Sequence, residues 1–159
     1  MMISPKTKIG HVHLTVSNLE KSLQFYRDIL GFEVTNKYGK SAVFLSAGGY
    51  HHHIGLNVWQ GEGIPPQPQG FAGLYHFAIL LPSRLELAKV LKSLVVNKYP
   101  IEGASNHGVS EAIYLRDPDN IGIELYCDTP EETWVKNADG MIEMDSKQLD
   151  INALLALVK

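Results

Sequence analysis

The chain contains two similar segments, and this internal repeat constrains the fold more than any other feature of the sequence. Residues 9–20, IGHVHLTVSNLE, can be aligned with residues 74–86, LYHFAILLPSRLE. Each combines a short alternating strand carrying histidine with a helix start of the capping-box form S-x-x-E, led by Ser17 or Ser83. The repeat predicts two strands, each followed by an amphipathic helix.

Further strand-like segments follow each predicted helix, and Gly, Asn and Pro turn residues separate them. They are residues 31–39, 40–49 and 50–59 in the first half, and residues 110–118 and 121–128 in the second half. Gly31 can end the first helix in a left-handed conformation. The first half therefore reads βαβββ, and the repeat predicts the same order for the second half, where two of the three later strands are visible.

The expected fold class is α+β, with residues 1–159 forming a single domain built from two βαβββ modules. The expected parts are modules 9–60 and 74–127, a Gly- and Pro-rich connector 61–73, and a C-terminal tail 128–159. Within the tail, residues 147–158 form a short apolar-rich helix candidate. We expect this helix to dock on the body of the protein, with a subunit contact as the alternative.

The charge pattern excludes several classes of partner. The formal net charge is -3 with the signs interspersed, which leaves no basic stripe for nucleic acid and no polybasic membrane face. No apolar run approaches membrane-spanning length, and MMISPKTK lacks the apolar part of a signal peptide. The single cysteine, Cys127, rules out an internal disulfide and reads as a small buried hydrophobe. We therefore expect a cytoplasmic protein with a small-molecule partner.

Strand alternation places the histidines of the first half on particular faces. In HVHLTV, His11 and His13 lie opposite the apolar Val12, Leu14 and Val16, which the helix should cover. The triple histidine of YHHHIGLNVW is divided in the same way. His52 is expected on the helix side, whereas His51 and His53 face the other way.

The second half places His76 and Glu124 on the face away from its helix, with Gly122 expected to leave space beside the carboxylate. A face with a carboxylate and several imidazoles cannot be an apolar core, because such groups must be paired or metal-bound when buried. Two histidines and one carboxylate form the ligand set typical of non-haem Fe(II) oxygenases. The candidate ligands are His11, His76 and Glu124.

These residues and the segment GHVHLTVSNLEKSLQFYRDILGFEV resemble the vicinal-oxygen-chelate superfamily, the glyoxalase, bleomycin resistance and dioxygenase family. The resemblance covers residues 9–130 and implies paired βαβββ modules whose mixed sheets curl around one metal. It also implies that His11, His76 and Glu124 are the metal ligands and that His13 lines the cavity.

Residues 105–124, SNHGVSEAIYLRDPDNIGIE, resemble the signature of extradiol dioxygenases more specifically. The matching positions are His107, Ile113, Tyr114, Asp117, Pro118 and Glu124. Ser105 departs from the usual pattern, and Asn120 stands where glycine is usual, although asparagine also accepts a left-handed turn.

The resemblance implies ring cleavage of a catechol-like aromatic diol by O₂, as in aromatic catabolism. His53 would move protons as acid and base, and His107 and Tyr114 would hydrogen-bond substrate and intermediates. Taken singly, His53 equally fits a solvated histidine at a strand edge, and His107 a surface histidine in a loop. The expected cofactor is a divalent metal, Fe(II) first and Mn(II) next, although Zn and Ni also suit these ligands.

Other functions within the resemblance stay open. They are a glyoxalase-type lyase or isomerase, a thiol transferase, and a metal-free binding or resistance protein. Gly55 and Asn57 occupy the strand where glyoxalase I places a fourth ligand, and residues 84–120 offer few cations for a phosphonate pocket. Many extradiol enzymes contain two such module pairs, so this chain resembles a one-pair version. The sequence also leaves open a homodimer and whether the modules pair within or between chains.

Overall fold

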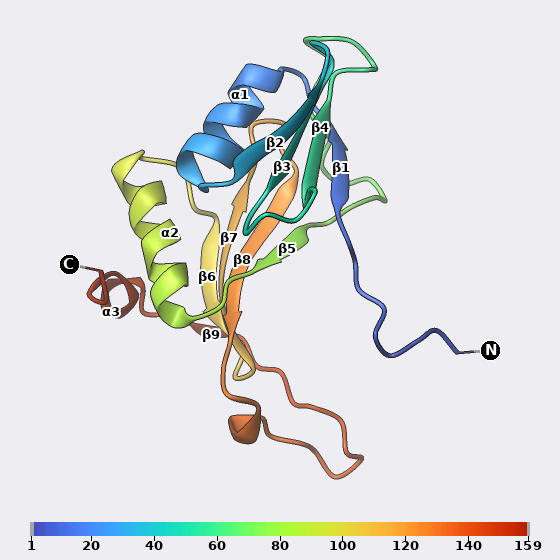
Figure 1. Ribbon diagram of the computed structural model, residues 1–159. Helices are drawn as coiled ribbons and strands as arrows, with labels where there is room; N and C mark the ends of the chain where they lie inside the picture. The colour runs from blue at the N-terminus through green and yellow to red at the C-terminus, as the bar shows by residue number, and fades with distance from the viewer. Residues whose placement is uncertain (1, 159) are drawn as a thin grey trace. The chain divides into compact units, whose positions relative to one another are not determined.

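The structure is a computed structural model that describes residues 2–158 (Figure 1). It divides into two compact units, Met1–Pro66 and Gln67–Lys159, and the boundary falls within the segment predicted as the connector. Each unit contains one copy of the repeat. Both units combine helices with one mixed sheet, so the fold is α+β as expected.

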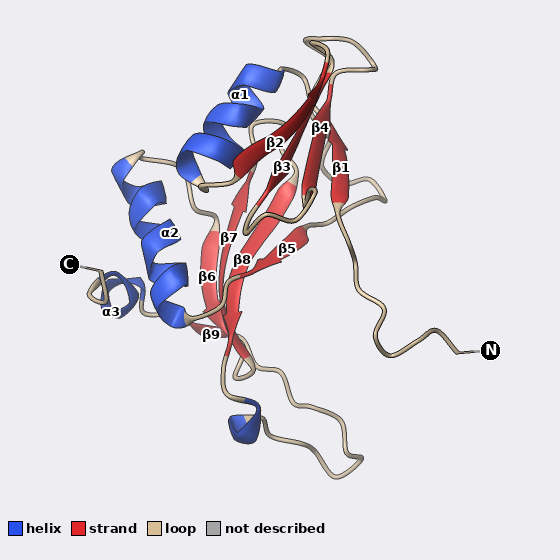
Figure 2. Ribbon diagram, in the orientation of Figure 1, coloured by secondary structure: helices blue, strands red, loops and turns tan. Residues whose placement is uncertain are grey.

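The first unit has the predicted βαβββ order. Its elements are β1 (Val12–Thr15), α1 (Leu19–Leu23), the π-helix η1 (Gln24–Ile29), β2 (Glu33–Tyr38), β3 (Ala42–Ser46) and β4 (Ile54–Asn57). The sheet order is β1-β4-β3-β2, with β1 parallel to β4 and the other pairs antiparallel. The helical segment lies along one face of this sheet, where Phe25 and Tyr26 are buried (Figure 2).

The start of α1 differs from the prediction by one residue. Asn18, not Ser17, is the N-cap, and its side-chain oxygen accepts the backbone N–H of Lys21 at 2.9 Å. Asparagine caps helices as well as serine does, so residue type did not distinguish these two adjacent positions. The end of the helical segment is as predicted, because Gly31 has a φ of 87°.

The second unit repeats this arrangement and extends it. Its elements are β5 (Phe77–Leu80), α2 (Arg84–Val96), β6 (Gly103–Asn106), β7 (Ser110–Arg116), β8 (Gly122–Asp128), the 3-10 turn η2 (Glu131–Thr133), β9 (Lys147–Gln148) and α3 (Ile151–Leu155). The sheet order is β5-β8-β7-β6-β9, and β5 is parallel to β8 as β1 is to β4. Ser83 caps α2 as predicted, accepting the N–H of Glu86 at 3.3 Å.

The core of the second unit lies between α2 and one face of its sheet (Figure 2). The buried side chains are Leu87, Leu91 and Leu94 from α2 and Ile113, Leu115, Ile123 and Leu125 from β7 and β8. Cys127 is buried as expected, and burial raises the pKa of its thiol. The opposite face of the sheet is the one that the sequence pattern assigned to polar side chains.

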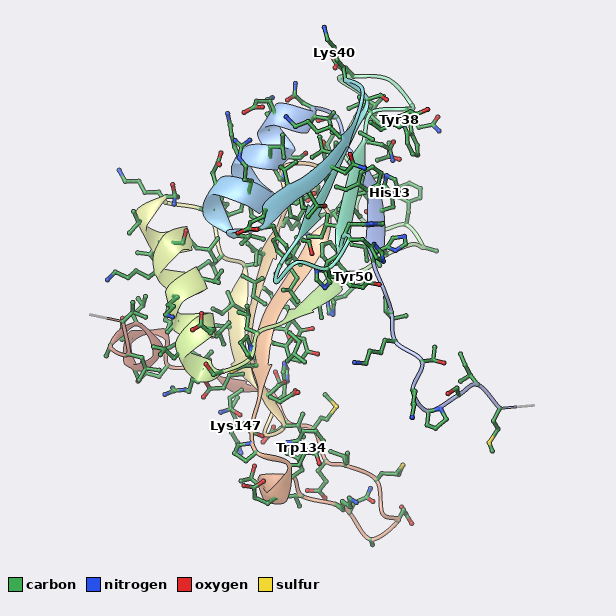
Figure 3. All side chains as sticks on the ribbon, viewed as in Figure 1. His13, Tyr38, Lys40, Tyr50, Trp134 and Lys147 are labelled. Atoms are coloured by element: carbon green, nitrogen blue, oxygen red, sulfur yellow. The ribbon has the colours of Figure 1, made fainter. Side chains whose placement is uncertain are left out.

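The tail is more ordered than the prediction suggested. After β8 the chain makes a long excursion and returns as β9, which pairs with β6. Trp134, whose ring N–H donates to the Thr129 carbonyl, and Lys147 of β9 lie near the base of this excursion (Figure 3). The predicted helix over 147–158 is therefore a two-residue strand followed by the five-residue α3, whose Leu154 is fully buried.

Across residues 2–158, no helix has both the length and the apolar character needed to cross a membrane.

Candidate functional site

The carboxylate of Glu124 is the centre of a hydrogen-bonded cluster in the second unit. Its Oε2 lies 3.0 Å from His76 Nε2, and its Oε1 accepts the Tyr114 hydroxyl at 3.1 Å. The Glu124 side chain is only 14% exposed, compared with 31% for His76. Two neighbouring groups therefore compensate a carboxylate that is largely withdrawn from water.

The sheet register explains this grouping. Tyr114 of β7 lies directly opposite Glu124 of β8, so their side chains share a face. The neighbours Ile123 and Leu125 are buried on the other face, as alternation predicts. His76 directly precedes β5, which runs parallel to β8. The predicted grouping of His76 with Glu124 on the face away from α2 is confirmed.

Gly122 plays a different part from the one predicted. The sequence suggested that it leaves space beside the carboxylate, but that space is filled by backbone. A Cβ built at Gly122 would collide with the Tyr75 carbonyl oxygen and lie 3.0 Å from His76 Cβ. Only glycine lets the chain before β5 approach β8 so closely, and this approach puts His76 next to Glu124.

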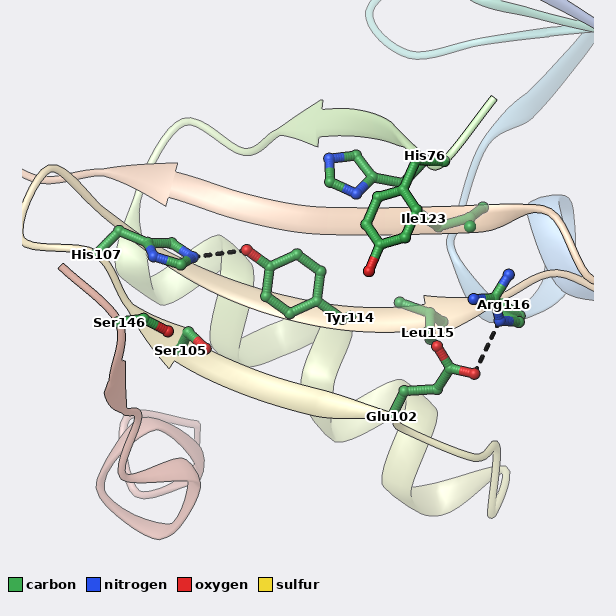
Figure 4. Close-up of a pocket in the computed structure, with 11 residues that line it drawn as sticks. His76, Glu102, Ser105, His107, Tyr114, Leu115, Arg116, Ile123 and Ser146 are labelled. Carbon is green, nitrogen blue, oxygen red and sulfur yellow. Dashed lines mark hydrogen bonds and ion pairs between the residues drawn. The ribbon is translucent and has the colours of Figure 1, made fainter. Parts of the chain in front are cut away.

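His107 extends the cluster through Tyr114. Its Nε2 lies 2.6 Å from the Tyr114 hydroxyl (Figure 4). Its Nδ1 lies 2.6 Å from the backbone carbonyl oxygen of Asp145. Burial, and secondly the nearby Glu124, raise the pKa of Tyr114 to about 12, so the phenol keeps its proton at neutral pH. A hydroxyl has one proton, which it can donate either to Glu124 or to His107 Nε2.

Three members of this cluster, His76, Tyr114 and His107, line a pocket of about 310 Å³ on the open side of the sheet (Figure 4). The lining residues are Tyr75, His76, Glu102, Ser105, His107, Tyr114, Leu115, Arg116, Gly122, Ile123 and Ser146. Arg116 is a cation at the pocket wall, but its guanidinium donates to the Glu102 carboxylate at 2.9 Å and to the Asn120 carbonyl at 3.0 Å. The side chains at the pocket wall are therefore mainly aromatic and neutral polar, because Leu115 and Ile123 are buried on the other face of the sheet.

The turn between β7 and β8 keeps these strands in register. Asp117 Oδ1 accepts the N–H groups of Asp119 and Ile121 at 2.9 and 2.8 Å. Asn120 has a φ of 67°, which confirms that it takes the left-handed position where glycine was expected. Its side-chain amide also donates to the Gln67 carbonyl at 2.8 Å, a contact that glycine could not make.

In the first unit, His11 occupies the place that His76 has in the second, directly before the first strand of its sheet. Its ring centroid lies 4.4 Å from that of His52. The prediction that His52 points to the helix side is wrong. Residues 51–53 form a bend before β4, and Thr35 donates its hydroxyl to the His51 carbonyl at 2.7 Å.

The other histidines of the bend have different surroundings. His53 Nδ1 accepts the Ala47 N–H at 3.3 Å and lies 3.1 Å from the Ser46 hydroxyl. His51 Nδ1 lies 2.8 Å from His52 Nδ1. Burial, and secondly His11, lower the pKa of His52 and thereby favour its neutral form. Of the three histidines, His52 is the one in ring contact with His11.

His13 lies over Gly55, its partner in the parallel β1–β4 pair. A Cβ at Gly55 would come within 2.9 Å of the His13 ring. The space beside Gly55 is therefore occupied by the His13 imidazole.

The pair His76 and Glu124 fits two of the ligands of a divalent metal ion. Two ligand atoms each about 2.1 Å from one ion, in adjacent octahedral positions, lie about 3 Å apart. His76 Nε2 and Glu124 Oε2 have this spacing, at 3.0 Å. His11, the third candidate, belongs to the first unit. Within residues 2–158, no three His, Cys, Asp or Glu side chains are grouped to hold a metal.

Sequence reasoning missed one member of the cluster, Asp145. It acts through its main-chain carbonyl and lies 38 residues after His107. Any residue other than proline offers the same carbonyl and N–H groups, so no residue type marked this position.

Comparison with known proteins agrees with this arrangement. Residues 8–125 match the family described as Glyoxalase/Bleomycin resistance protein/Dioxygenase superfamily. The catechol-2,3-dioxygenase of Bacillus subtilis strain 168 is 42% identical over 153 residues, which are 96% of this chain and 53% of that protein. The manganese-dependent 2,3-dihydroxybiphenyl 1,2-dioxygenase of Geobacillus genomosp. 3 is 30% identical over 130 residues, or 80% of this chain and 38% of that one.

The chain thus spans about half the length of the first relative and less of the second. Among solved structures, a glyoxalase/dioxygenase from Nostoc punctiforme has the same fold, with a TM-score of 0.66 at 20% identity. That similarity covers 82% of this chain and 98% of the other. The repeat, the two βαβββ units and the family match together place this chain in the Glyoxalase/Bleomycin resistance protein/Dioxygenase superfamily.

Proposed function

We propose that this protein is a metal-dependent extradiol dioxygenase that cleaves the ring of a catechol-like diol with O₂. The observation that carries the proposal is the cluster of His76, Glu124, Tyr114 and His107, in which a metal-ligand pair is joined to a protonated phenol and an imidazole. The 42% identity with a catechol-2,3-dioxygenase along nearly the whole chain supports it.

In this proposal His11, His76 and Glu124 hold the metal, which is Fe(II) or Mn(II). When bound, the ion supplies the redox chemistry with oxygen that no side chain of this protein can provide. The protein contributes the ligand atoms and the polar groups around them. Glu124 can bind an ion through Oε2 while Oε1 keeps the Tyr114 hydroxyl in place.

The side chains beyond the ligands hold and move protons. The 2.6 Å contact between Tyr114 and His107 joins a hydroxyl to an imidazole nitrogen, two groups that serve in general acid–base catalysis. Tyr114 therefore presents either a hydrogen-bond donor or an acceptor to a group in the pocket. The aromatic side chains of the pocket wall, Tyr75 and Tyr114, suit the ring of the diol.

Besides His107, a histidine of the first unit would take part in proton transfer. The sequence favoured His53 for proton transfer, but the geometry favours His52. The His52 ring contacts the candidate ligand His11, with ring centroids 4.4 Å apart. His53 Nδ1 is instead directed at Ser46 and Ala47. We therefore assign the proton-transfer role to His52 and keep His53 as the alternative.

The test is anaerobic loading of the full chain with Fe(II), followed by oxygen uptake with a panel of catechols. We expect oxygen consumption and a yellow ring-fission product. The proposal is wrong if the loaded protein consumes no oxygen with any diol and instead isomerises or conjugates thiol adducts. Those are the activities of the alternative lyase, isomerase and thiol transferase functions. Failure to bind any divalent ion would instead favour a metal-free binding protein.

Matched variants assign the roles. Glu124→Gln should abolish metal binding and oxygen uptake, whereas Glu102→Gln in the same pocket wall should keep both, because Glu102 pairs with Arg116 rather than with a histidine. His52→Gln should lower kcat by about 10²–10⁴-fold, the usual contribution of a general acid or base. An equal loss in His53→Gln with none in His52→Gln would restore the role to His53.

A further inference from the structure

The segment Asp145–Leu149, here called the tail strap, lies against the turn that carries His107. It is beyond the matched family region, which ends at residue 125. Two main-chain groups of Asp145 bind His107 reciprocally. The Asp145 N–H donates to the His107 carbonyl at 3.0 Å, and His107 Nδ1 lies 2.6 Å from the Asp145 carbonyl oxygen. The tail strap thus holds both the backbone and the ring of His107.

The tail strap is itself anchored. Its β9 residues Lys147 and Gln148 pair with β6, directly before His107. Leu149 donates its N–H to the Ala104 carbonyl at 3.3 Å, and its side chain is only 4% exposed. The carbonyl of Asp145 is therefore fixed relative to the sheet that carries Tyr114 and Glu124.

The excursion before the tail strap begins at the same place. Thr129 donates its N–H to the Val109 carbonyl at 2.9 Å and its hydroxyl to the Gly108 carbonyl at 2.8 Å. The chain therefore leaves and rejoins the sheet at the His107 turn, so both ends of the excursion hold this turn.

A backbone carbonyl can only accept a hydrogen bond, which decides where His107 carries its protons. Nδ1 must be protonated whenever it faces the Asp145 carbonyl, in the neutral and in the charged ring alike. The proton that comes and goes is then confined to Nε2, the nitrogen 2.6 Å from the Tyr114 hydroxyl. The ring can relay a proton only towards Tyr114 and, beyond it, Glu124.

We propose that Asp145 is a positioning residue, and that the tail strap holds His107 as the Nδ1–H tautomer with Nε2 directed at Tyr114. The catalytic consequence rests on the proposed dioxygenase function, but the tautomer itself does not. Because the tail strap acts through main-chain groups, side-chain changes at Asp145 should be tolerated, whereas loss of its backbone bonds should not.

The first measurement is made on the native protein, and a variant serves only to assign its signals. Protein labelled with ¹⁵N-histidine, metal-free and loaded with diamagnetic Zn²⁺, is examined by NMR through ring nitrogen-to-proton couplings, and His107→Gln identifies the signals. We expect the neutral His107 ring to carry its proton on Nδ1 in both samples. A bare Nδ1 with the proton on Nε2 would overturn the proposal.

The second measurement compares Asp145→Pro with Asp145→Ala. Proline removes the N–H that binds the His107 carbonyl. Alanine keeps this N–H and removes the side-chain contacts to Ser146 and Lys147 together with the carboxylate charge near His107. We expect Asp145→Pro to give a mixture of tautomers and a kcat lower by about 10- to 100-fold with little change in KM for the diol. Asp145→Ala should keep the native tautomer and kcat.

If Asp145→Pro does not fold, Leu149→Ala provides the comparison, with Leu154→Ala as its control. Both leucines are buried in the tail, but only Leu149 belongs to the tail strap. The proposal fails if Leu149→Ala and Leu154→Ala leave the same His107 tautomer. The native protein could carry the proton on Nδ1, lose this tautomer in the tail-strap variants, and yet cleave no diol. That result would support the role of the tail strap and reject the dioxygenase function.

Discussion

Gly122 is the residue at which the absence of a side chain determines the geometry of the site. Its Cα faces the Tyr75 carbonyl and His76 Cβ without room for a further carbon. Because His76 reaches Glu124 through this close approach, the proposed metal-ligand pair depends on a residue that offers no ligand atom.

Gly122→Ala is therefore expected to move Tyr75 and His76 away from β8. The free energy of unfolding should fall by about 1–3 kcal/mol through overpacking, and Mn(II) affinity should fall at least about tenfold as His76 leaves Glu124. Urea unfolding and titration calorimetry measure both. Gly103→Ala is the control, since a Cβ at Gly103 would meet nothing within 4 Å. Equal behaviour of the two variants would contradict this account.

At the scale of elements, the start of α1 depends on one side chain. Asn18 accepts the Lys21 N–H at 2.9 Å and thereby satisfies one of the free donors of the first turn. We expect Asn18→Ala to lower the free energy of unfolding by about 0.5–2 kcal/mol in urea, and Asn18→Ser to recover most of the loss, because serine also caps. A serine variant as unstable as the alanine variant would show that Asn18 stabilises the helix in another way.

Strand β6 shows why an element can escape prediction. Its sequence, GASN, contains residues that favour turns, and neither alternation nor β-branched side chains mark it. It is a strand because β7 and β9 bind it on both sides. Its neighbour β7, with SEAIYLR, has a clear alternating pattern and was predicted.

At the scale of the whole molecule, the proposed function assigns His11 to the same ligand set as His76 and Glu124, and this assignment can be tested. His11→Gln is expected to lower Mn(II) affinity at least about 100-fold, more than the loss of an outer partner. His13→Gln should have a much smaller effect, because the His13 ring packs on Gly55, Phe44 and Trp59. Titration calorimetry on both variants checks this. Unchanged affinity in His11→Gln would remove the first unit from the site.

Stability should also fall at alkaline pH. Burial raises the pKa of Tyr99 above the ordinary tyrosine value of 10.0, and it raises the pKa of the Cys127 thiol. Both groups are neutral when protonated, so the unfolded chain releases these protons first. Their contribution is present below the unfolded pKa and is lost as the pH rises through the folded one.

Tyr99→Phe tests this dependence. It removes the hydrogen bond to the Arg116 carbonyl and should cost about 1 kcal/mol at neutral pH. Above pH 10.0, the ordinary tyrosine value, the variant should lose stability less steeply than the native protein. Thermal melts between neutral and alkaline pH measure both slopes. Parallel slopes would show that Tyr99 ionises equally in both states.

Much of the fold is visible in the sequence because it depends on local or periodic features. The repeat, the alternation that sends Glu124 to the open face, the Ser83 cap and the left-handed Asn120 all follow from residue type and spacing. The pairing of His76 with Glu124 was also predicted, because strand periodicity and family resemblance agreed there.

Only the tertiary structure decided the contacts that main-chain atoms make between distant segments. The bend at residues 51–53 brings His52, rather than His53, to His11, and Thr35 holds it through a carbonyl. The backbone of Tyr75 fills the space beside Gly122, and Asp145 directs His107 through its own carbonyl. Backbone groups are the same in every residue except proline, so contacts of this kind leave no pattern in the sequence. They become visible only when the chain has folded and brought these segments together.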